Sequence, residues 1–333
     1  MSSITIREAT IKDVNKLANL HTVSGWKISR EHITKIVKFS NSNNYSKLLV
    51  ADSNEEIVGR VILDTVFPPY AEIVNIIVHP NYRGMGIGTY IITECIKRAV
   101  KVGHNIIYLM CDPVDRDLHR FYSRLGFLPG ILGNPASPRG DMWLYRFDRG
   151  SFVNDFLEKH PFAEFQVSRS KEEFHGIELY SMKWRDPITE DELKVFIKGQ
   201  PGQPKEGGTM PRINAVSIKS EELSLDCWVV EENSNIYRQD SKNFRVHLLN
   251  NSDEALCAKL IPLPSRGIRV SLRSSSNVII PPKSDVSLIG ELTLSIDFDV
   301  KVDYLTFPTI VSSLIIGASC NTNLLVSTGF NLH

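Results

Sequence analysis

A short run of alternate glycines after an arginine contains the residue types with the clearest chemical use. The stretch NYRGMGIGTYIITECIKRA, residues 81–99, places Gly84, Gly86 and Gly88 just before a segment with apolar residues at helical spacing. Glycine permits positive φ and has no Cβ, so several backbone N–H groups can face one ligand. The first turn of a helix adds unpaired N–H donors and a partial positive charge. The stretch therefore predicts a phosphate site, most simply for a pyrophosphate, with Arg83 as a fixed cation.

Two common phosphate motifs do not fit this stretch. A Walker loop needs a lysine directly after its last glycine, and GIGTYI has none. A dinucleotide-binding fingerprint needs a third glycine where Thr89 stands. Taken alone, the glycines could also form only a turn between a strand and a helix.

Composition limits the class of protein. A chain of 333 residues, 42% hydrophobic and 23% charged, predicts a globular protein of two domains. Residues 1–150 hold 19 Lys and Arg against 14 Asp and Glu, a positive excess that suits a small phosphorylated ligand but is too dispersed to predict nucleic-acid binding. The five cysteines show no metal-ligand or disulfide spacing, and no apolar run is long enough for a membrane span. We therefore expect a cytoplasmic protein with no metal and no membrane partner.

Strand and helix patterns alternate through residues 1–150 and predict an α+β unit with a mixed sheet and flanking helices. The last predicted helix is opened by Asp112, with Pro113 at its first position. The expected strands are residues 3–10, 46–52, 55–65, 71–78, 105–111 and 141–148, and the expected helices are residues 11–21, 29–39, 89–102 and 112–126.

The second half of the chain has a different pattern. Residues 151–160 and 189–199 look helical, and a Pro/Gly-rich connector follows at residues 199–212. From Ile213 onward, strand patterns recur about every ten residues and predict an all-β, antiparallel sandwich. The expected division is an α+β unit with the glycine stretch at residues 1–150, bridging helices, a strand and a linker at residues 151–210, and an accessory β-sandwich at residues 211–333.

The glycine stretch also resembles a family motif. IIVHPNYRGMGIGTYIITECIKRA resembles the RxxGxG acyl-CoA motif of the GNAT superfamily of N-acetyltransferases, with Arg83, Gly86 and Gly88 at the motif positions. FYSRLGF, residues 121–127, resembles the second signature of that family. The resemblance covers residues 4–147. It implies a GNAT-like fold, acetyl-CoA as the acyl donor, and direct transfer of the acetyl group to a primary amine in a ternary complex.

The resemblance assigns residues to the acyl donor. The backbone of β-strand residues would pair with the pantetheine arm, and the glycine loop would wrap the pyrophosphate. Asp115 stands where the family often has an asparagine, and an ionised carboxylate could accept a hydrogen bond from the arm but not donate one. The residues so assigned are Ile76, Ile77 and Val78 for the arm, and Arg83, Gly84, Met85, Gly86, Ile87, Gly88 and Thr89 for the pyrophosphate.

Two residues are candidates for proton transfer. Tyr122 falls where the family commonly has a general acid that protonates the departing thiolate; the alternative is that it packs behind its helix, as Phe121 would. Glu72, within AEIV, matches the general base of the superfamily's histone acetyltransferases; the alternative is an exposed carboxylate at the start of a strand, with Asp112 or water as the base. Strict alternation would place Glu72 on the face of Val78 unless a bulge intervenes.

The acceptor is left open by the sequence. It could be a small-molecule amine or a protein amine, and the chain could form a homodimer. The segment around Trp26 lies between the first two helical patterns, where this fold commonly forms the acceptor wall; the alternative role of Trp26 is that of a packed aromatic residue. The alternative function is a non-catalytic acyl-CoA-binding sensor or interaction protein with the β-sandwich as a partner-binding module.

Overall fold

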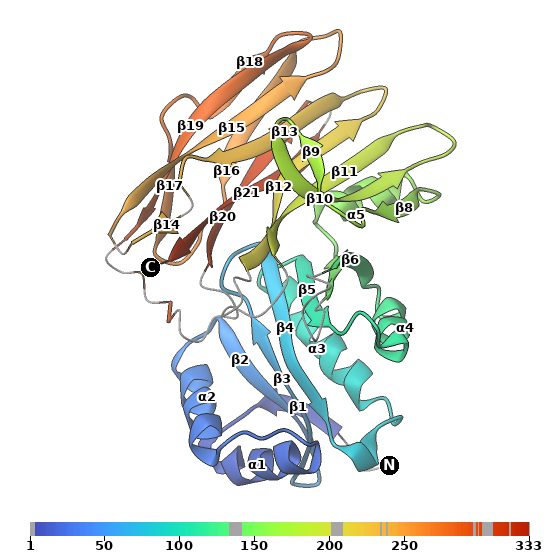
Figure 1. Cartoon of the computed structure of the whole chain (residues 1–333), viewed down its shortest axis with the longest axis vertical. Helices are drawn as coiled ribbons and strands as arrows, with labels where there is room; N and C mark the ends of the chain where they lie inside the picture. Colours follow the sequence, from blue (N-terminus) through green and yellow to red (C-terminus); the bar gives the residue numbers. More distant parts are fainter. Residues whose placement is uncertain are drawn as a thin grey trace.

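The computed structural model describes residues 4–132, 142–200, 209–233, 235–237, 239–295, 298, 300–301, 309–319 and 321–332. The chain folds as an N-terminal part with helices on a sheet and a C-terminal part of strands, stacked along the long axis (Figure 1). In the described part of the chain, no helix is both long and apolar enough to cross a membrane.

The N-terminal sheet has seven strands in the order β1-β2-β3-β4-β5-β7-β6. β4 and β5 pair in parallel, and the other neighbours are antiparallel. The strands are β1 (Ile4–Glu8), β2 (Ser46–Ser53), β3 (Glu56–Asp64), β4 (Tyr70–Val78), β5 (Ile106–Cys111), β6 (Leu128–Leu132) and β7 (Met142–Phe147). The helices are α1 (Val14–Val23), α2 (Arg30–Ser42), α3 (Ile87–Lys101) and α4 (Arg116–Arg124), with single 3-10 turns η1 (Ile11–Asp13) and η2 (Pro80–Tyr82).

Helices cover both faces of this sheet (Figure 1). On one face, Leu17 of α1 and Val37 of α2 share a buried cluster with Val50 of β2. On the other face, Ile91 of α3 shares a cluster with Leu49 of β2. Neighbouring strand residues point to opposite faces, so one strand supplies both clusters. The predicted α+β class with a mixed sheet and flanking helices is confirmed, and β6 is a strand that the sequence pattern did not predict.

The start of α4 differs from the prediction. The helix begins at Arg116, and Asp115 is its N-cap, accepting hydrogen bonds from the backbone N–H of Asp117 at 3.1 Å and of Leu118 at 3.0 Å. Asp112 instead accepts a hydrogen bond from the N–H of Val114 in the preceding turn. Both aspartates are good capping residues, and the second one starts the helix.

The C-terminal part is an antiparallel sandwich, as predicted. A nine-stranded sheet, with the path β17-β19-β15-β13-β12-β11-β10-β8 and β9 beside β10, faces a five-stranded sheet ordered β14-β21-β20-β16-β18. Val216 of the first sheet and Leu314 and Val326 of the second lie in one buried cluster. The elements are α5 (Phe152–Lys159), β8 (Glu164–Val167), β9 (Glu172–Phe174), β10 (Ile177–Arg185), β11 (Glu192–Gln200), β12 (Thr209–Lys219), β13 (Ser224–Glu231), β14 (Asn235–Ile236), β15 (Ser241–Asn250), β16 (Leu256–Pro262), β17 (Ile268–Leu272), β18 (Asn277–Ile280), β19 (Ser284–Leu294), β20 (Thr309–Ala318) and β21 (Thr322–Leu332).

The helix predicted at residues 189–199 is wrong, because this segment contains β11. Leu193, Val195 and Ile197 are buried with period two, and β11 pairs with β10 on one side and β12 on the other. Pairing on both edges outweighs the weak helix preference of its Glu, Lys and Leu residues. Residues 201–208 of the predicted connector lie outside the described residues, and the domain boundaries at residues 150 and 210 stay a prediction.

Buried contacts join the two parts of the chain. The hydroxyl of Tyr70, on β4, accepts a hydrogen bond from the N–H of Ile213 at 2.9 Å and lies 2.7 Å from Ser327 Oγ. Trp143, on β7, belongs to the same buried cluster as residues of both sandwich sheets. The sandwich therefore packs as a fixed body against one end of the N-terminal sheet.

Candidate functional site

A bulge bends β4 in the middle of its length. Asn75 has a left-handed φ of 55°, and the register between β3 and β4 shifts between Arg60 and Ile62. Asparagine is one of the few residues that adopt this conformation readily. A bulge shifts the alternation of side chains along its strand, so residues before and after Asn75 follow different face patterns.

The second half of β4 has one edge without a strand partner in the described part of the chain. Residues 70–72 pair in parallel with residues 106–108 of β5, and beyond that point β4 pairs only with β3. β5 continues along β7 instead. The carbonyl of Val78, at the end of β4, accepts a hydrogen bond from Arg83 Nε at 3.3 Å. The backbone of residues 76–78 is therefore placed to pair with an extended ligand on the side of β5.

The glycine loop leads from β4 into α3. Gly84 and Gly86 have φ values of 77° and 80°, and Gly86 is the N-cap of α3. No atom lies within 4 Å of the position that a Cβ would occupy at either glycine, so the loop is open to a ligand there. Ile87 is buried and anchors the first turn of the helix, while Met85 and Thr89 are exposed.

The start of α3 meets β4 and α4 at Gly88. A Cβ at this position would lie 3.3 Å from the ring of Phe121 and 3.9 Å from the side chain of Val78. Arg83 is exposed beside the loop. The structure thus brings the predicted arm-binding strand, the predicted pyrophosphate loop and the helix of Tyr122 together, while their contacts with a donor stay a prediction.

Tyr122 lies inside the cluster between the sheet, α3 and α4. Its ring packs at 5.2 Å from the ring of Phe121 and at 5.9 Å from that of Phe127, between ring centroids. Burial, together with the nearby Cys111 and Asp115, raises the pKa of its hydroxyl well above the usual range. The phenol is therefore protonated at neutral pH, as a proton donor must be, and the packing role is also present.

Glu72 lies on the sheet face of α1 and α2. Its neighbours Ala71 and Ile73 belong to the cluster on the α3 side, and Ile76 and Val78 also contact that cluster. Glu72 therefore does not share the face of Ile76 and Val78, which strict alternation without a bulge would have given. The bulge at Asn75 is the physical reason, because it shifts the alternation by one residue.

The carboxylate of Glu72 is buried. The residue is 6% exposed, so the alternative of an exposed carboxylate at the start of a strand is wrong. Tyr108 of β5 donates a hydrogen bond from its hydroxyl to Glu72 Oε2 at 3.4 Å. Asp64 lies directly across from Glu72 on β3. Two carboxyl groups and a tyrosine hydroxyl therefore form a row across three strands.

Comparison with known proteins identifies the N-terminal part. Residues 12–127 match the model of the acetyltransferase (GNAT) family. This segment is a GNAT acetyltransferase domain. The match confirms the resemblance seen in the glycine stretch, and it leaves residues 128–333 outside the family model.

The similar proteins each match less than half of the chain. An uncharacterized N-acetyltransferase, ycf52, of Pyropia yezoensis is 28% identical over 140 residues, which are 40% of this chain and 75% of that protein. An uncharacterized N-acetyltransferase of Methanocaldococcus jannaschii is 44% identical over 57 residues, 17% of this chain and 25% of that protein. The crystal structure of the PaiA N-acetyltransferase of Thermoplasma acidophilum in complex with coenzyme A superposes on 44% of this chain and 99% of its own, with 21% identity and a TM-score of 0.38.

Asp64 is a buried carboxyl group of the GNAT domain that sequence reasoning missed. It is 9% exposed, and its Oδ1 atom makes no hydrogen bond to the described residues, while the side chain bonds to Ser46. Burial raises the pKa of Asp64 from 3.8 to about 7, an effect that the hydrogen bond from Ser46 only partly offsets. An aspartate at the end of a strand is typical of the start of a turn, so the sequence gives no sign that Asp64 is buried.

Asp64→Asn is expected to change how stability depends on pH. The folded protein holds a proton on Asp64 that the unfolded chain loses at lower pH, so wild-type stability falls as the pH rises from about 4 to about 7. Relative to the variant, the wild type should lose roughly 2–4 kcal/mol of unfolding free energy between pH 4 and pH 8. Chemical denaturation of both proteins at these two pH values measures the difference, and parallel pH profiles would contradict the assignment.

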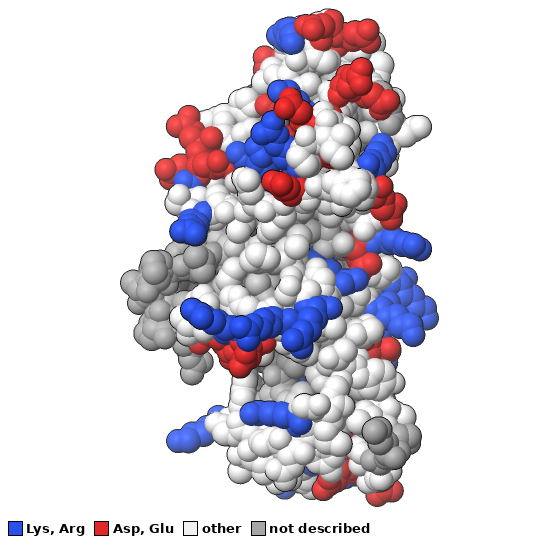
Figure 2. All heavy atoms as spheres, turned by 90° about the vertical axis from the view of Figure 1, so that its right-hand side faces the viewer, with Lys and Arg blue, Asp and Glu red and all other residues white. Residues whose placement is uncertain are grey.

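The GNAT domain carries basic side chains on the side of α4. A band of Lys and Arg crosses the middle of this face, below an upper region in which Asp and Glu are more frequent (Figure 2). Arg116, Arg120 and Arg124 are exposed along α4 at a spacing of four residues, which places them on one side of the helix. A basic face near the glycine loop suits a donor with several phosphate groups.

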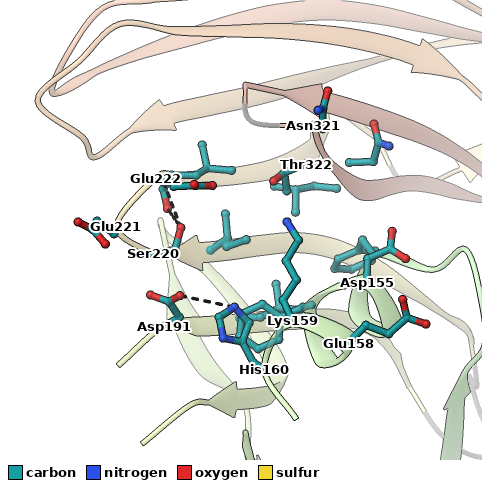
Figure 3. Close-up of a pocket in the computed structure, with 17 residues that line it drawn as sticks. Asp155, Glu158, Lys159, His160, Asp191, Ser220, Glu221, Glu222, Asn321 and Thr322 are labelled. Atoms are coloured by element: carbon teal, nitrogen blue, oxygen red, sulfur yellow. Dashed lines mark hydrogen bonds and ion pairs between the residues drawn. The ribbon is translucent and has the colours of Figure 1, made fainter. Parts of the chain in front are cut away.

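A separate cavity of about 610 Å³ lies between α5 and the turns of the sandwich (Figure 3). Phe152 and Phe156 line it from α5, and His160 lies at its edge, with Nδ1 3.3 Å from Asp186 and Nε2 3.5 Å from Asp191. None of its lining residues is among those assigned to the donor or to proton transfer. We therefore assign this cavity no part in the reaction of the GNAT domain.

Proposed function

We propose that this chain is an acetyl-CoA-dependent N-acetyltransferase that transfers an acetyl group to a primary amine by direct attack. The observation that carries the proposal is the unpartnered edge of β4 at residues 76–78, which leads straight into the glycine loop and the N-terminus of α3. Membership of residues 12–127 in the acetyltransferase family supports it. The coenzyme A complex of the Thermoplasma acidophilum N-acetyltransferase names the donor class for that protein, and we extend it to this one.

The donor would bind along β4 and the loop. An extended pantetheine arm adds to the free edge of residues 76–78 as an additional strand would. The pyrophosphate then lies at Gly84, Gly86 and the first turn of α3, with Arg83 beside it. Because the arm runs from the loop back along β4, its thioester end reaches the bulge at Asn75.

The chemistry needs one proton removed and one supplied. The amine nitrogen attacks the thioester carbonyl carbon, a C–N bond forms and the C–S bond breaks. Glu72, directly or through water, takes the proton that the nitrogen loses, with Asp112 as the alternative base. Tyr122 gives its proton to the departing thiolate, which requires negative charge to build on sulfur because a phenol is a weaker acid than a thiol.

A thiol-release assay tests the proposal. The full chain is incubated with acetyl-CoA and a panel of small-molecule amines and protein amines, and free thiol is measured with a chromogenic disulfide. Amine-dependent release supports the transferase. Coenzyme A binding without release for any amine would instead favour a non-catalytic acyl-CoA sensor with the sandwich as its partner-binding module. Analytical ultracentrifugation of the same sample tests the proposed homodimer.

Glu72→Gln is expected to lower kcat at neutral pH while coenzyme A affinity stays unchanged. We expect a loss of about 10-fold, below the roughly 10²–10⁴-fold range for a general base, because water can accept the proton in its place. Asp112→Asn tests the alternative base, a carboxylate that accepts the N–H of Val114 in a turn. A larger loss in Asp112→Asn than in Glu72→Gln would move the base to Asp112.

A further inference from the structure

Two nitrogens of a buried guanidinium in the GNAT domain have no hydrogen-bond partner among the described residues. Arg60, on β3, is 1% exposed, and its Nε and Nη2 atoms make no hydrogen bond. Burial lowers the pKa of Arg60 to about 10, and no carboxylate contributes to that value. The group is therefore charged at neutral pH. An unpaired buried charge is strongly unfavourable, so its presence calls for a function.

Two further polar groups, His21 near Arg60 and Ser24 three residues after His21, also lack hydrogen-bond partners in the described part of the chain. Both ring nitrogens of His21, which is 1% exposed, and the Oγ of Ser24, one helical turn further along, make no hydrogen bond in the described part of the chain. Burial, with a contribution from the charge of Arg60, lowers the pKa of His21 to about 4, so its ring is neutral. Buried polar groups nearly always have partners. Three such groups together indicate a place where a polar ligand binds.

The position of Arg60 relates this cluster to the reaction. Arg60 pairs with Val50 of β2 and Ile77 of β4, and both belong to the cluster under α1 and α2, so Arg60 points to the same face as Glu72. The bulge at Asn75 is two residues from Ile77, roughly 7 Å along the strand. An anion at Arg60 would thus lie within a few bonds of an amine that attacks at the bulge.

We propose that Arg60, with His21 and Ser24, binds a carboxylate of the acceptor, so that the acceptor is a small amine that also carries a carboxylate, as amino acids do. The inference rests on the proposed acetyl transfer. The guanidinium can donate two parallel hydrogen bonds to a carboxylate, and the neutral imidazole and the hydroxyl can each donate one more. Polyamines, and amino sugars that have no acidic group, lack the carboxylate that this site recognises.

The connection between α1 and α2 lies beside His21 of this cluster. Residues 24–29 connect α1 to α2, and Trp26 within them is 42% exposed, with its ring 6.2 Å from that of His21 in an edge-on arrangement. We place the entry of the ligand at this connection, because Trp26 within it packs against His21. The same segment is where the sequence predicted the acceptor wall.

The first test is thermal stability. Arg60→Met removes an unpaired buried charge and keeps the apolar volume, so we expect the apparent melting temperature of the full chain to rise by about 2–4 °C. Arg212→Met is the matched control, because Arg212 is also buried but pairs with Glu231 at 3.3 Å and bonds to the carbonyl of Gly329. That variant should melt at a lower temperature. A loss of stability in Arg60→Met similar to that of Arg212→Met would show a structural role and overturn the proposal.

The second test compares matched acceptors by thiol release. α-Amino acids and 4-aminobutyrate are each paired with the corresponding carboxamide, which keeps the amine and removes the negative charge. We expect kcat/KM of the wild type to be about 10–100-fold higher for the best acid than for its amide. In Arg60→Met the acid should lose this advantage while the amide and coenzyme A affinity are unchanged, and Arg60→Lys should restore part of it.

The outcomes separate this proposal from the proposed function. Thiol release without preference for acids, or a preference that Arg60→Met retains, would overturn the carboxylate site and leave the transferase intact. If none of the tested amines gives thiol release, the transferase is contradicted. In that case the site is judged by melting curves in propionate and in propionamide at equal concentration. Stabilisation of the wild type by propionate alone, absent in Arg60→Met, would support the anion site, and equal curves would overturn it.

Discussion

Gly86→Glu is expected to abolish coenzyme A binding by the full chain. Gly86 is the N-cap of α3 and has a φ of 80°, a conformation that disfavours residues with a Cβ. Among the described residues other than its chain neighbours, no atom lies within 4 Å of its Cβ position, so an added Cβ has open space there. The new side chain places a carboxylate where we assign the pyrophosphate. We expect the dissociation constant for coenzyme A, measured by calorimetry, to rise at least about 100-fold from this repulsion.

The matched control for Gly86→Glu is Gly103→Glu. Gly103 has a φ of 87°, also has no atom within 4 Å of its Cβ position, and follows the opposite end of α3. The two variants therefore share the backbone strain and the added charge, and they differ in their distance from the loop. Wild-type affinity in Gly86→Glu would contradict the pyrophosphate assignment. Equal loss of affinity in both variants would trace the effect to strain in α3.

Most of the GNAT domain could be predicted because its signals are local. The period-two runs of β2 and β3, the helical spacing in α3 and the glycines before it each act within a few residues. The start of α4 was misplaced because two aspartates compete for the same capping role, and local sequence does not say which one wins. β11 was predicted as a helix because its strand neighbours on both sides come from elsewhere in the chain, and local propensity contains no information about them.

The candidate site could be predicted only in part for the same reason. The glycine loop is a continuous segment, so its position followed from the sequence. The face of Glu72 depended on a bulge, for which Asn75 was a weak signal because asparagine tolerates positive φ. Arg60 and Asp64 read as ordinary charged residues in strands. Their burial comes from α1, α2 and the neighbouring strands, which only the folded chain brings over them.

The sandwich packs against the residue that holds the proposed base. Tyr108, the hydrogen-bond donor to Glu72, lies in the same buried cluster as Trp143, Trp184 and Val195. The C-terminal part therefore fixes a residue that holds the proposed base, in addition to covering one end of the sheet. The hydrogen bonds between Tyr70 and both Ile213 and Ser327 join β4 to the sandwich two residues before Glu72.

Tyr122→Phe is expected to lower kcat by about 10²-fold with little change in coenzyme A affinity. The substitution keeps the ring between Phe121 and Phe127 and removes only the hydroxyl, so the fold and the donor site stay intact. Because burial keeps the pKa of this hydroxyl well above its usual range, its loss should lower activity equally across neutral and mildly basic pH. Steady-state thiol release at several pH values measures both effects.

The control for Tyr122→Phe is Tyr82→Phe, which removes a hydroxyl near the glycine loop that bonds to Glu56 at the surface. This control should keep wild-type kcat, because the hydroxyl of Tyr82 bonds to Glu56 and does not enter the cluster between α3 and α4. An unchanged kcat in Tyr122→Phe would leave that residue a packing role only and assign the proton for the thiolate to solvent. A tenfold or larger loss confined to Tyr122→Phe would instead require its hydroxyl in the transition state, because Tyr122→Phe keeps the ring packing of the wild type.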